Sequence, residues 1–554
     1  MLRKFKILSW LFNYKLAWLP TDFVGGLTTA AVVIPKSMAY SVIAGLPVEV
    51  GLYAALASML AYPLFGSSRP LSVSLTSEIA ILTGAAVIGI TASSSNIPAE
   101  TIATTLALLV GGFLLLARFL RLGFLSNFVS APVLVGFKTG IGIVVIVSQL
   151  KSVFGLHIGG HSTIDTLLEL FGLITHTHMP TLVVAISGLV ILASISRFFP
   201  KLPAPMIWMV LSILASALFG FAALGISTVG SVPSGLPSLA LPNMSLIPQL
   251  WPAALGIALM AFTESVAAAR TFLHRDDPAI NPNRELIALG AANIASAFVG
   301  GLPVGGGTSQ TSVAEEAGVN SQMAQWVNAL LVVVVLLLFS DEIGFLPQAA
   351  LAILVIYTTL HMVDPSSFRA IAKIRRDEFF WALITLVGVI VIGTLDGILL
   401  AVAISILTLF YQSNHPPVYA VAYNHKKDIF RRVGEDENDE EIPGILILRT
   451  EGRLTFANAE STRQKMHIMI EKSKPKVVVL ECSAIPDIEY TALLMLIESE
   501  ENLRSQGISL WLAAVNPDLL NVLKRSSLFN TLGHDRMFFN LKKVLDAWKN
   551  KQND

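Results

Sequence analysis

Long apolar runs recur along the first three quarters of the chain. Examples are residues 103–116, 182–195, 327–339 and 380–411, which hold almost no charged side chains. Several of these runs approach the ~20 residues that a helix needs to span the hydrocarbon core of a bilayer. The pattern predicts fourteen membrane segments, at residues 22–42, 50–66, 75–92, 101–118, 127–149, 179–197, 203–221, 252–271, 284–299, 308–317, 324–340, 346–362, 378–394 and 396–412.

The pattern changes after Gln412. Residues 413–442 contain Pro416-Pro417 and Lys426-Lys427 and are rich in charge, which is typical of a solvated linker. Beyond them, strand-like runs alternate with helical patterns, as in an α/β domain. The strand-like runs are 445–448, 477–480 and 508–515, and the helical patterns are 456–472, 491–505, 517–525 and 540–549. The sequence thus predicts a transmembrane domain over 1–412, a linker over 413–442 and an α/β domain over 443–554.

Charged residues sort to one side of the predicted segments. With a cytoplasmic N-terminus, sixteen lysines and arginines fall in loops on that side, including Arg69, Arg118 and Arg369, and only Lys151 falls on the other. Cytoplasmic loops carry an excess of these residues. A single miscounted segment would mix the two sides, so the asymmetry supports the count. It predicts a multi-pass protein of the cell (inner) membrane with both termini in the cytoplasm.

Composition agrees with a protein that needs a lipid bilayer around it. Hydrophobic residues make up 54% of the chain and charged residues 14%, whereas soluble domains carry about 25% charged residues. The formal net charge is zero, so we expect no nucleic-acid partner. Cys482 is the only cysteine, which argues against disulfides and cysteine metal sites. Because HExxH, P-loop and nucleophile-elbow motifs are absent, we expect no enzyme activity, cofactor or metal site.

Fourteen segments divide into two sets of seven, and an odd number per set places the sets in inverted orientation. Inverted repeats typically hold the substrate at the membrane midplane, where interrupted helices expose their ends. Corresponding interruptions occur in the two sets. The third segment contains Thr76-Ser77-Glu78, and the tenth contains Thr308-Ser309-Gln310 after glycines 305–307. We therefore expect the starts of these two segments to face each other.

Helix N-termini explain why this pattern suits an anion. The first amides of a helix have no acceptor within the helix, and the macrodipole places partial positive charge there. Glycine lets an anion approach the backbone, and hydroxyl groups donate further hydrogen bonds. The alternative is that the glycines form an ordinary loop and that Thr-Ser recurs by chance. The predicted substrate-binding residues are Lys36, Thr76, Ser77, Glu78, Gly307, Thr308, Ser309 and Gln310.

Four ionisable residues lie inside predicted segments, namely Lys36, Glu78, Lys138 and Glu264. A charge at the bilayer centre costs about 2.5–3.5 kcal/mol on insertion scales, so such residues are usually functional or paired. Glu264 is the candidate for coupling, either as a proton carrier or as a Na⁺ ligand beside Thr263 and Thr308. Lys36 either balances the charge of the substrate or pairs with an acid. For Glu78 and Lys138, a structural ion pair between helices explains the charge equally well.

At these residues the chain resembles the SulP family of anion transporters, and the resemblance covers almost the whole chain. Residues 34–40 read IPKSMAY and are followed by AGLP and GLY, similar to the family signature IPQxMAY, AGLP, GLY. The stretch Phe262-Thr263-Glu264-Ser265 and residues 300–304 also match the family. The C-terminal part resembles a STAS domain at 454–459 and 487–492.

The resemblance implies a fold of fourteen transmembrane segments in two inverted repeats, with a core part, a gate part and elevator-like movement between them. It also implies homodimers and a cytoplasmic regulatory STAS domain that can bind cytoplasmic proteins. The starts of segments 3 and 10 would bind the anion, and Glu264 would serve Na⁺ or H⁺ coupling. Two positions depart from the family. Lys36 replaces the usual glutamine, and Gln310 replaces an arginine of many animal members, so a positive charge is exchanged between two walls of the expected site.

We therefore expect a secondary active transporter that couples uptake of an inorganic oxyanion, sulfate or bicarbonate, to Na⁺ or H⁺. A dicarboxylate symporter is the second substrate class. An anion exchanger or a channel with little concentrative transport belongs to a different class. Glu264 argues against a channel, because a passive pore needs no coupling carboxylate. Accumulation of the anion against a gradient distinguishes these alternatives.

Overall fold

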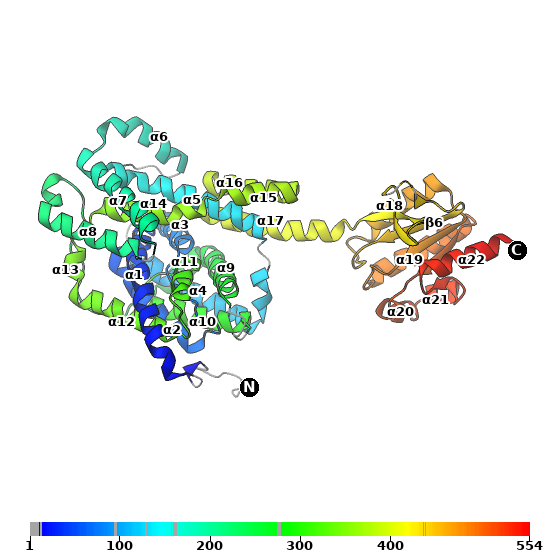
Figure 1. Ribbon diagram of the computed structural model, residues 1–554, viewed down its shortest axis with the longest axis horizontal. Coiled ribbons are helices and arrows are strands. Elements are labelled where there is room, and N and C mark those ends of the chain that lie inside the picture. The colour runs from blue at the N-terminus through cyan, green and yellow to red at the C-terminus, as the bar shows by residue number, and fades with distance from the viewer. Residues whose placement is uncertain are drawn as a thin grey trace. The chain divides into compact units, whose positions relative to one another are not determined.

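The chain divides into two compact units, Met1–Ser405 and Ile406–Asp554. The structure is a computed structural model, shown in Figure 1. It describes residues 10–11, 14–93, 97–127, 130–156, 158, 163–200, 202–273, 277, 279–435, 437 and 439–553.

All fourteen predicted segments coincide with helices, and no boundary differs from the predicted one by more than five residues, an offset found at the end of α5 and at the start of α9. The helices are α1 (Leu19–Ile43), α2 (Val48–Phe65), α3 (Ser77–Ser93), α4 (Ala99–Phe119), α5 (Ala131–Phe154), α7 (Met179–Phe198), α8 (Ala204–Phe219), α9 (Ile247–Thr271), α10 (Pro282–Phe298), α11 (Thr308–Glu316), α12 (Met323–Leu338), α14 (Gln348–Thr359), α16 (Arg376–Val391) and α17 (Thr394–Asn414). Shorter helices, α6 (Thr163–Leu173), α13 (Ser340–Ile343) and α15 (Pro365–Ile374), lie between them.

Local sequence fixes where these helices begin and end. Among the described residues, six helices are long and apolar enough to cross a membrane, and others, such as α8 and α12, are apolar but shorter. The helix α10 begins with a proline, which has no backbone N–H, at a position where the helix needs no donor. The Asn281 side chain caps this helix by accepting a hydrogen bond from the amide of Arg284. Gly155 ends α5 in the left-handed conformation, with φ of 65°.

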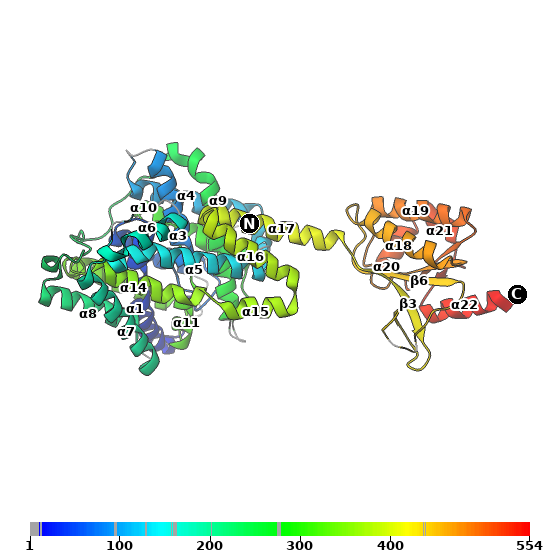
Figure 2. The ribbon, with the colours of Figure 1, turned by 90° about the horizontal axis from the view of Figure 1, so that it is seen from above.

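The helices of the first unit form two groups. The first group comprises α1–α4 and α9–α12, in which α10 packs on α2 and α4, and α12 packs on α1 and α2. The second comprises α5, α7, α8, α14 and α16, with α5 against α14 and α16. Figure 1 shows α5, α14 and α16 above α2, α10 and α12, and α5 and α14 stay adjacent in Figure 2. Each group thus takes matching segments from the two halves of the chain, as the predicted core and gate parts require.

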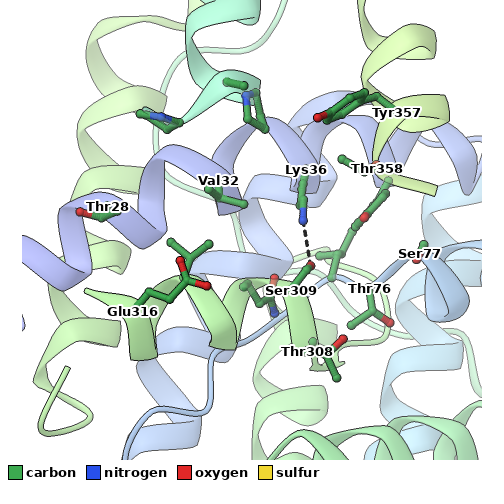
Figure 3. Close-up of a pocket in the computed structure, with 18 of the residues that line it drawn as sticks. Thr28, Val32, Lys36, Thr76, Ser77, Thr308, Ser309, Glu316, Tyr357 and Thr358 are labelled. Carbon is green, nitrogen blue, oxygen red and sulfur yellow. Dashed lines mark hydrogen bonds between the residues drawn. The ribbon is translucent and has the colours of Figure 1, made fainter. Parts of the chain in front are cut away.

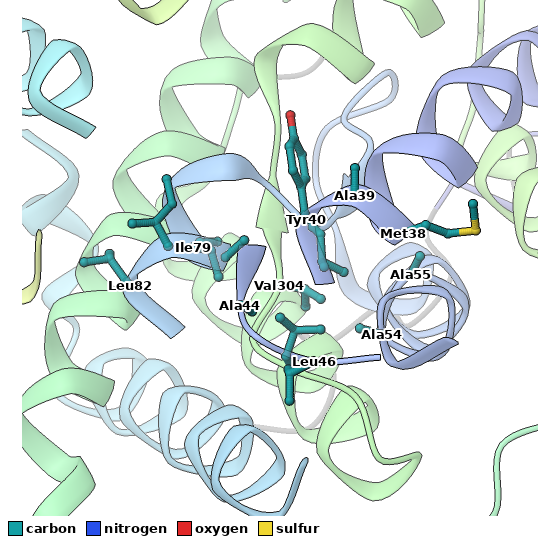
Figure 4. Packing of buried hydrophobic residues seen from close by; sticks show 14 of the residues in the cluster. Met38, Ala39, Tyr40, Ala44, Leu46, Ala54, Ala55, Ile79, Leu82 and Val304 are labelled. Carbon is teal, nitrogen blue, oxygen red and sulfur yellow. The ribbon is translucent and has the colours of Figure 1, made fainter. Parts of the chain in front are cut away.

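Small side chains let the helices of the first group approach closely. A Cβ at Gly51 of α2 would lie 2.1 Å from the carbonyl oxygen of Ser37 on α1, so only glycine fits this crossing. Nearby, Met38, Leu46 and Val304 are buried among the side chains drawn in Figure 4. This packing holds α1 against the chain that leads into α11.

Buried polar contacts fix the same segment. The Asn293 side chain on α10 accepts a hydrogen bond from the amide of Val304 at 3.0 Å, and it donates one to the carbonyl oxygen of Val304, also at 3.0 Å. An amide pair of this kind satisfies both backbone groups of a buried extended residue. The extended chain before α11 is therefore anchored to α10.

A sheet forms the middle of the second unit. Its strands run in the order β4-β3-β6-β7-β8-β9, with β6, β7, β8 and β9 parallel and β3 antiparallel to β6. The short strand β5 also pairs antiparallel with β3. The strands are β3 (Val418–Asn424), β4 (Ile429–Arg432), β5 (Asp439–Glu440), β6 (Ile445–Thr450), β7 (Val477–Glu481), β8 (Ser509–Ala513) and β9 (Met537–Phe538). The helices are α18 (Ala459–Ser473), α19 (Tyr490–Ser505), α20 (Pro517–Leu523), α21 (Ser527–Leu532) and α22 (Leu541–Asn553). The α/β pattern predicted for this part of the chain is confirmed.

Residues 413–442 differ from the expected solvated linker. The helix α17 extends to Asn414, and β3 and β4 belong to the sheet. Val421 in β3 is buried, whereas Lys426 and Lys427 are exposed in the turn between the two strands. Edge strands such as β4 commonly carry charged side chains, which oppose pairing with another chain. The prediction of a linker is therefore wrong for 418–424, 429–432 and 439–440, which extend the α/β domain toward its N-terminal side.

Candidate functional site

Two short strands join the halves of the first unit. β1 (Val73–Ser74) and β2 (Gly305–Gly306) pair antiparallel, and each lies just before a helix, since α3 begins at Ser77 and α11 at Thr308. A Cβ at Gly306 would lie 2.9 Å from Cδ1 of Leu71, so the glycine permits this close pairing. The ladder therefore brings the N-termini of two helices side by side, as the repeated Thr-Ser motif predicted.

The first turn of α11 offers backbone donors. Its N-cap residue, Gly307, has no side chain to accept a hydrogen bond, and the first helical bond runs from the amide of Thr311 to Gly307 at 3.2 Å. Among the described residues, the amides of Thr308, Ser309 and Gln310 have no acceptor. Free amides at a helix N-terminus carry partial positive charge and bind anions.

Lys36 adds a full positive charge at this helix end. It lies in α1 directly after Pro35, which cannot donate the backbone hydrogen bond expected at its position. The Lys36 Nζ donates a hydrogen bond to Oγ of Ser309 at 2.8 Å, as Figure 3 shows. Among the described residues, no carboxylate forms a salt bridge with Lys36. Of the two roles expected for Lys36, its position agrees with balancing a bound anion.

Two glutamates and a lysine form a cluster beside the helix ends. The Nζ of Lys138, on α5, lies 3.4 Å from Oε1 of Glu78 on α3 and 3.4 Å from Oε1 of Glu264 on α9. The Thr76 hydroxyl donates to Oε2 of Glu264 at 3.3 Å, and the Ser77 hydroxyl donates to Oε2 of Glu78 at 2.9 Å. Both carboxylates are buried, where an unpaired charge would be costly. The ammonium and the hydroxyl donors compensate the charges of the two carboxylates.

These side chains line one cavity of about 800 Å³. Its walls come from both helix groups, because α5, α8 and α14 contribute residues as well as α1, α3, α9 and α11. Figure 3 shows Thr76 and Thr308 near each other, with Lys36 above Ser309. The predicted residues that line the cavity are Lys36, Thr76, Ser77, Glu78, Glu264, Gly307, Thr308, Ser309 and Gln310.

Two predicted residues have other partners. The Gln310 amide accepts a hydrogen bond from Ser74 Oγ at 2.9 Å and donates one to the carbonyl oxygen of Ser72 at 2.9 Å, so it joins α11 to the chain at β1. The Thr263 hydroxyl donates to the carbonyl oxygen of Leu259 in its own helix at 2.7 Å, and Thr263 does not line the cavity. The structure therefore separates Thr263 from the other predicted residues.

Several residues of the cavity were not among the predicted site residues. Lys138 is the most important of them, because it contacts both glutamates from the second helix group. Tyr40 lies one helical turn after Lys36 on α1, so the i, i+4 spacing could have identified it. Tyr357 and Thr358 come from α14, and their sequence carries no comparable signal.

Comparison with known proteins identifies both units. The sulfate permease family matches residues 19–385, and the STAS domain matches residues 438–544. The probable sulfate transporter Rv1739c of Mycobacterium tuberculosis is 36% identical, with 97% of each chain covered. Human solute carrier family 26 member 6 is 27% identical over 92% of this chain and 70% of its own.

Solved structures share the fold. The murine Slc26a9 anion transporter in the inward-facing state superimposes with a TM-score of 0.88 at 22% identity, over 98% of this chain and 93% of its own. The transmembrane domain of the cyanobacterial bicarbonate transporter BicA matches with a TM-score of 0.62 at 22% identity, over 71% of this chain and 98% of its own. These matches support a helical transporter fold followed by a STAS domain.

The helical unit and the family match also agree on the class of protein. The match begins at the start of α1 and ends within α16, so it includes both helix ends and the cavity between them. The chain is a multi-pass membrane protein and a transporter of anions rather than an enzyme. It belongs to the sulfate permease family and carries a STAS domain at its C-terminal end.

Proposed function

We propose that the protein is a secondary active transporter that takes up a small inorganic oxyanion, sulfate or bicarbonate. The observation that carries this proposal is the pair of helix N-termini held together by β1 and β2, with the Lys36 ammonium on Ser309. Free amides, hydroxyl groups and one ammonium are donors that match the oxygens of such an anion. The names of two relatives, a sulfate transporter and a bicarbonate transporter, agree with this substrate class.

A dicarboxylate is the second candidate substrate. Its first carboxylate would bind the same donors as an inorganic oxyanion. A cavity of about 800 Å³ has room for the rest of such a molecule. Lys138 is paired with two glutamates, so it is a poor partner for a second carboxylate. This pairing favours the smaller anions.

Coupling is assigned to Glu264, with Na⁺ or H⁺ as the coupling ion. Glu264 is buried beside Thr76, whose neighbour Ser77 begins α3 at the candidate anion site. Binding of the anion and of the cation would therefore affect each other electrostatically over a short distance. An exchanger or a channel would not need this arrangement. The transport step is an elevator-like shift of the first helix group against the second, since the cavity lies between them.

The surroundings of the transporter complete the proposal. Both termini lie in the cytoplasm, the membrane is the inner membrane, and two copies form a homodimer. The STAS domain regulates transport through cytoplasmic protein partners. Lysine and arginine are in excess in the loops on the same side of the membrane as the N-terminus, which supports the orientation.

Uptake into proteoliposomes tests the proposal. The full-length protein is reconstituted, and uptake of radiolabelled sulfate, bicarbonate and fumarate is measured under separate Na⁺ and H⁺ gradients. We expect sulfate or bicarbonate to accumulate above its external concentration under one of the two gradients. Accumulation of fumarate alone would identify the dicarboxylate symporter. Equilibration of all three anions without accumulation would contradict the proposal and identify an exchanger or a channel.

A further inference from the structure

We propose that Lys138 is a tethered cation that takes the place of Na⁺ between Glu78 and Glu264, and that the coupling ion is therefore the proton. The inference rests on the proposed function and names its coupling ion. The Lys138 Nζ lies 3.4 Å from an oxygen of each glutamate. Carboxylate oxygens are the ligands that hard cations prefer. The position that would suit Na⁺ is thus taken by an ammonium group.

Na⁺ cannot share this position with Lys138. A second cation between the carboxylates would repel the ammonium at short range, and repulsion is strong where little water screens it. Displacement of Lys138 would leave its charge without a partner in the membrane, which is costly. Thr263, the other expected Na⁺ ligand, donates its hydroxyl to Leu259 and does not line the cavity. The residues present do not fit Na⁺.

A proton fits the same arrangement. The charged or titratable groups that line the cavity with Glu264 are Lys36, Tyr40, Glu78, Lys138, Glu316 and Tyr357. Glu316 lies at the C-terminal end of α11, away from the paired N-termini. The charges of the two lysines and the other two glutamates sum to zero. An arriving anion adds negative charge, and transfer of one proton from water to a Glu264 carboxylate oxygen compensates one negative charge. A proton needs no coordination sphere, and Thr76 Oγ1 can accept a hydrogen bond from the protonated carboxyl.

Lys138 also reaches across the two helix groups. It belongs to α5 in the second group, whereas Glu78 and Glu264 belong to α3 and α9 in the first. A shift of one group against the other changes the distance between the ammonium and the carboxylates. A proton on Glu264 lowers the cost of this change, because Lys138 then has to stay paired with Glu78 alone. Lys138 thus links protonation of the site to the movement of the groups, and it acts as a positioning residue without contact to the anion.

Replacement of Lys138 by methionine tests the inference. In proteoliposomes with a fixed inward H⁺ gradient, external Na⁺ is exchanged for choline, and initial uptake of sulfate and of bicarbonate is measured. We expect wild-type uptake to be unaffected by Na⁺. In Lys138→Met, whose carboxylates lack the ammonium, we expect Na⁺ to raise uptake about tenfold, within the usual range of coupling between two ligands. Lys138→Arg keeps the cation and should stay indifferent to Na⁺. Lys151→Met, which removes an exposed lysine of the same helix, is the matched control.

A binding measurement separates this inference from the proposed function. Na⁺, compared with choline, should raise the melting temperature of purified full-length Lys138→Met but not of the wild type, because a ligand stabilises the state that binds it. This readout needs no transport, so it stands even if no anion is carried. If Lys138→Met does not fold, Lys138→Gln takes its place, because it removes the positive charge, keeps both carboxylates and offers an amide donor to them. Na⁺-dependent uptake by the wild type, or a folded variant without any Na⁺ response, would overturn the inference.

Discussion

Lys36 and Lys138 line the same cavity but have different partners. Lys138 contacts Glu78 and Glu264, whereas Lys36 donates to Ser309 at the start of α11. The sequence showed both lysines inside predicted segments, but it could not show which of them pairs with the acids. That choice depends on contacts between helices far apart in the chain. The structure leaves Lys36 as the lysine whose charge is available to an anion.

Substitution of Lys36 should therefore weaken anion binding. A hydrogen bond to a charged group contributes about 1.5–3 kcal/mol, so we expect Lys36→Gln to raise the dissociation constant for the anion about 10-fold to 100-fold. Equilibrium binding of radiolabelled anion to the purified protein measures this. Lys36→Arg, which keeps the charge, is the control. An unchanged affinity in Lys36→Gln would show that the ammonium does not bind the anion.

Gln310→Arg tests whether a charge can be moved across the site. The double variant Lys36→Gln/Gln310→Arg should recover part of the lost affinity, because the new guanidinium lies in the first turn of α11. Recovery should be incomplete, since the substitution removes the hydrogen bonds that the Gln310 amide makes to Ser72 and Ser74. The four affinities form a double-mutant cycle. Additive effects without recovery would refute compensation between the two positions.

At the scale of elements, the strand pair β1–β2 positions the two helix ends. The sequence predicted that α3 and α11 would face each other, and this prediction is confirmed by the pairing. It could not predict the strands themselves, because two residues are too short to show an alternating pattern. The helices were predictable because long apolar runs carry their own signal. Their contacts, including that of Lys138, depend on packing.

A larger side chain in β2 should disturb the site. A Cβ at Gly306 would lie 2.9 Å from Leu71 and 3.1 Å from Cβ of Ser265. Overpacking of this kind usually costs about 1–3 kcal/mol, so we expect Gly306→Val to melt at a lower temperature and to bind the anion more weakly. Gly112→Ala is the control, because Gly112 is exposed on α4 and a Cβ added there would have no atom within 4 Å. Wild-type affinity in Gly306→Val would show that the strand pair does not position the helix ends.

At the scale of the whole molecule, the α/β unit begins earlier in the chain than its composition suggested. Its later strands were predictable because β6 and β7 are buried apolar runs. β3 and β4 were missed because their turn and edge carry charges that are also typical of a linker. Since β3 pairs with β6 from Val418 to Val421, the sheet includes both sides of the expected boundary.

The start of the sheet at β3 determines which deletion removes the whole STAS domain. All residues of the candidate site precede 363, so deletion of 416–554 should leave anion affinity within about twofold of the full-length value, as for distant sites. It should lower transport or the amount of protein at the membrane. Deletion of 443–554 should give more aggregated protein, because β3 loses its partner β6 and keeps an unpaired edge. Size-exclusion chromatography and binding assays compare the two truncations. Loss of binding in a folded 416–554 deletion would contradict the separation of the site from this domain.

Concentrative uptake by Glu264→Gln is the most direct test of the account. Glu264 is buried with Lys138 and Thr76 next to the helix ends, and its carboxylate is the proposed carrier of the coupling proton. The measurement is the ratio of internal to external radiolabelled anion in proteoliposomes under an inward H⁺ gradient. We predict that the wild type accumulates the anion and that folded Glu264→Gln brings it only to equilibrium, because glutamine cannot bind and release a proton. Full gradient-driven accumulation by Glu264→Gln would contradict the account.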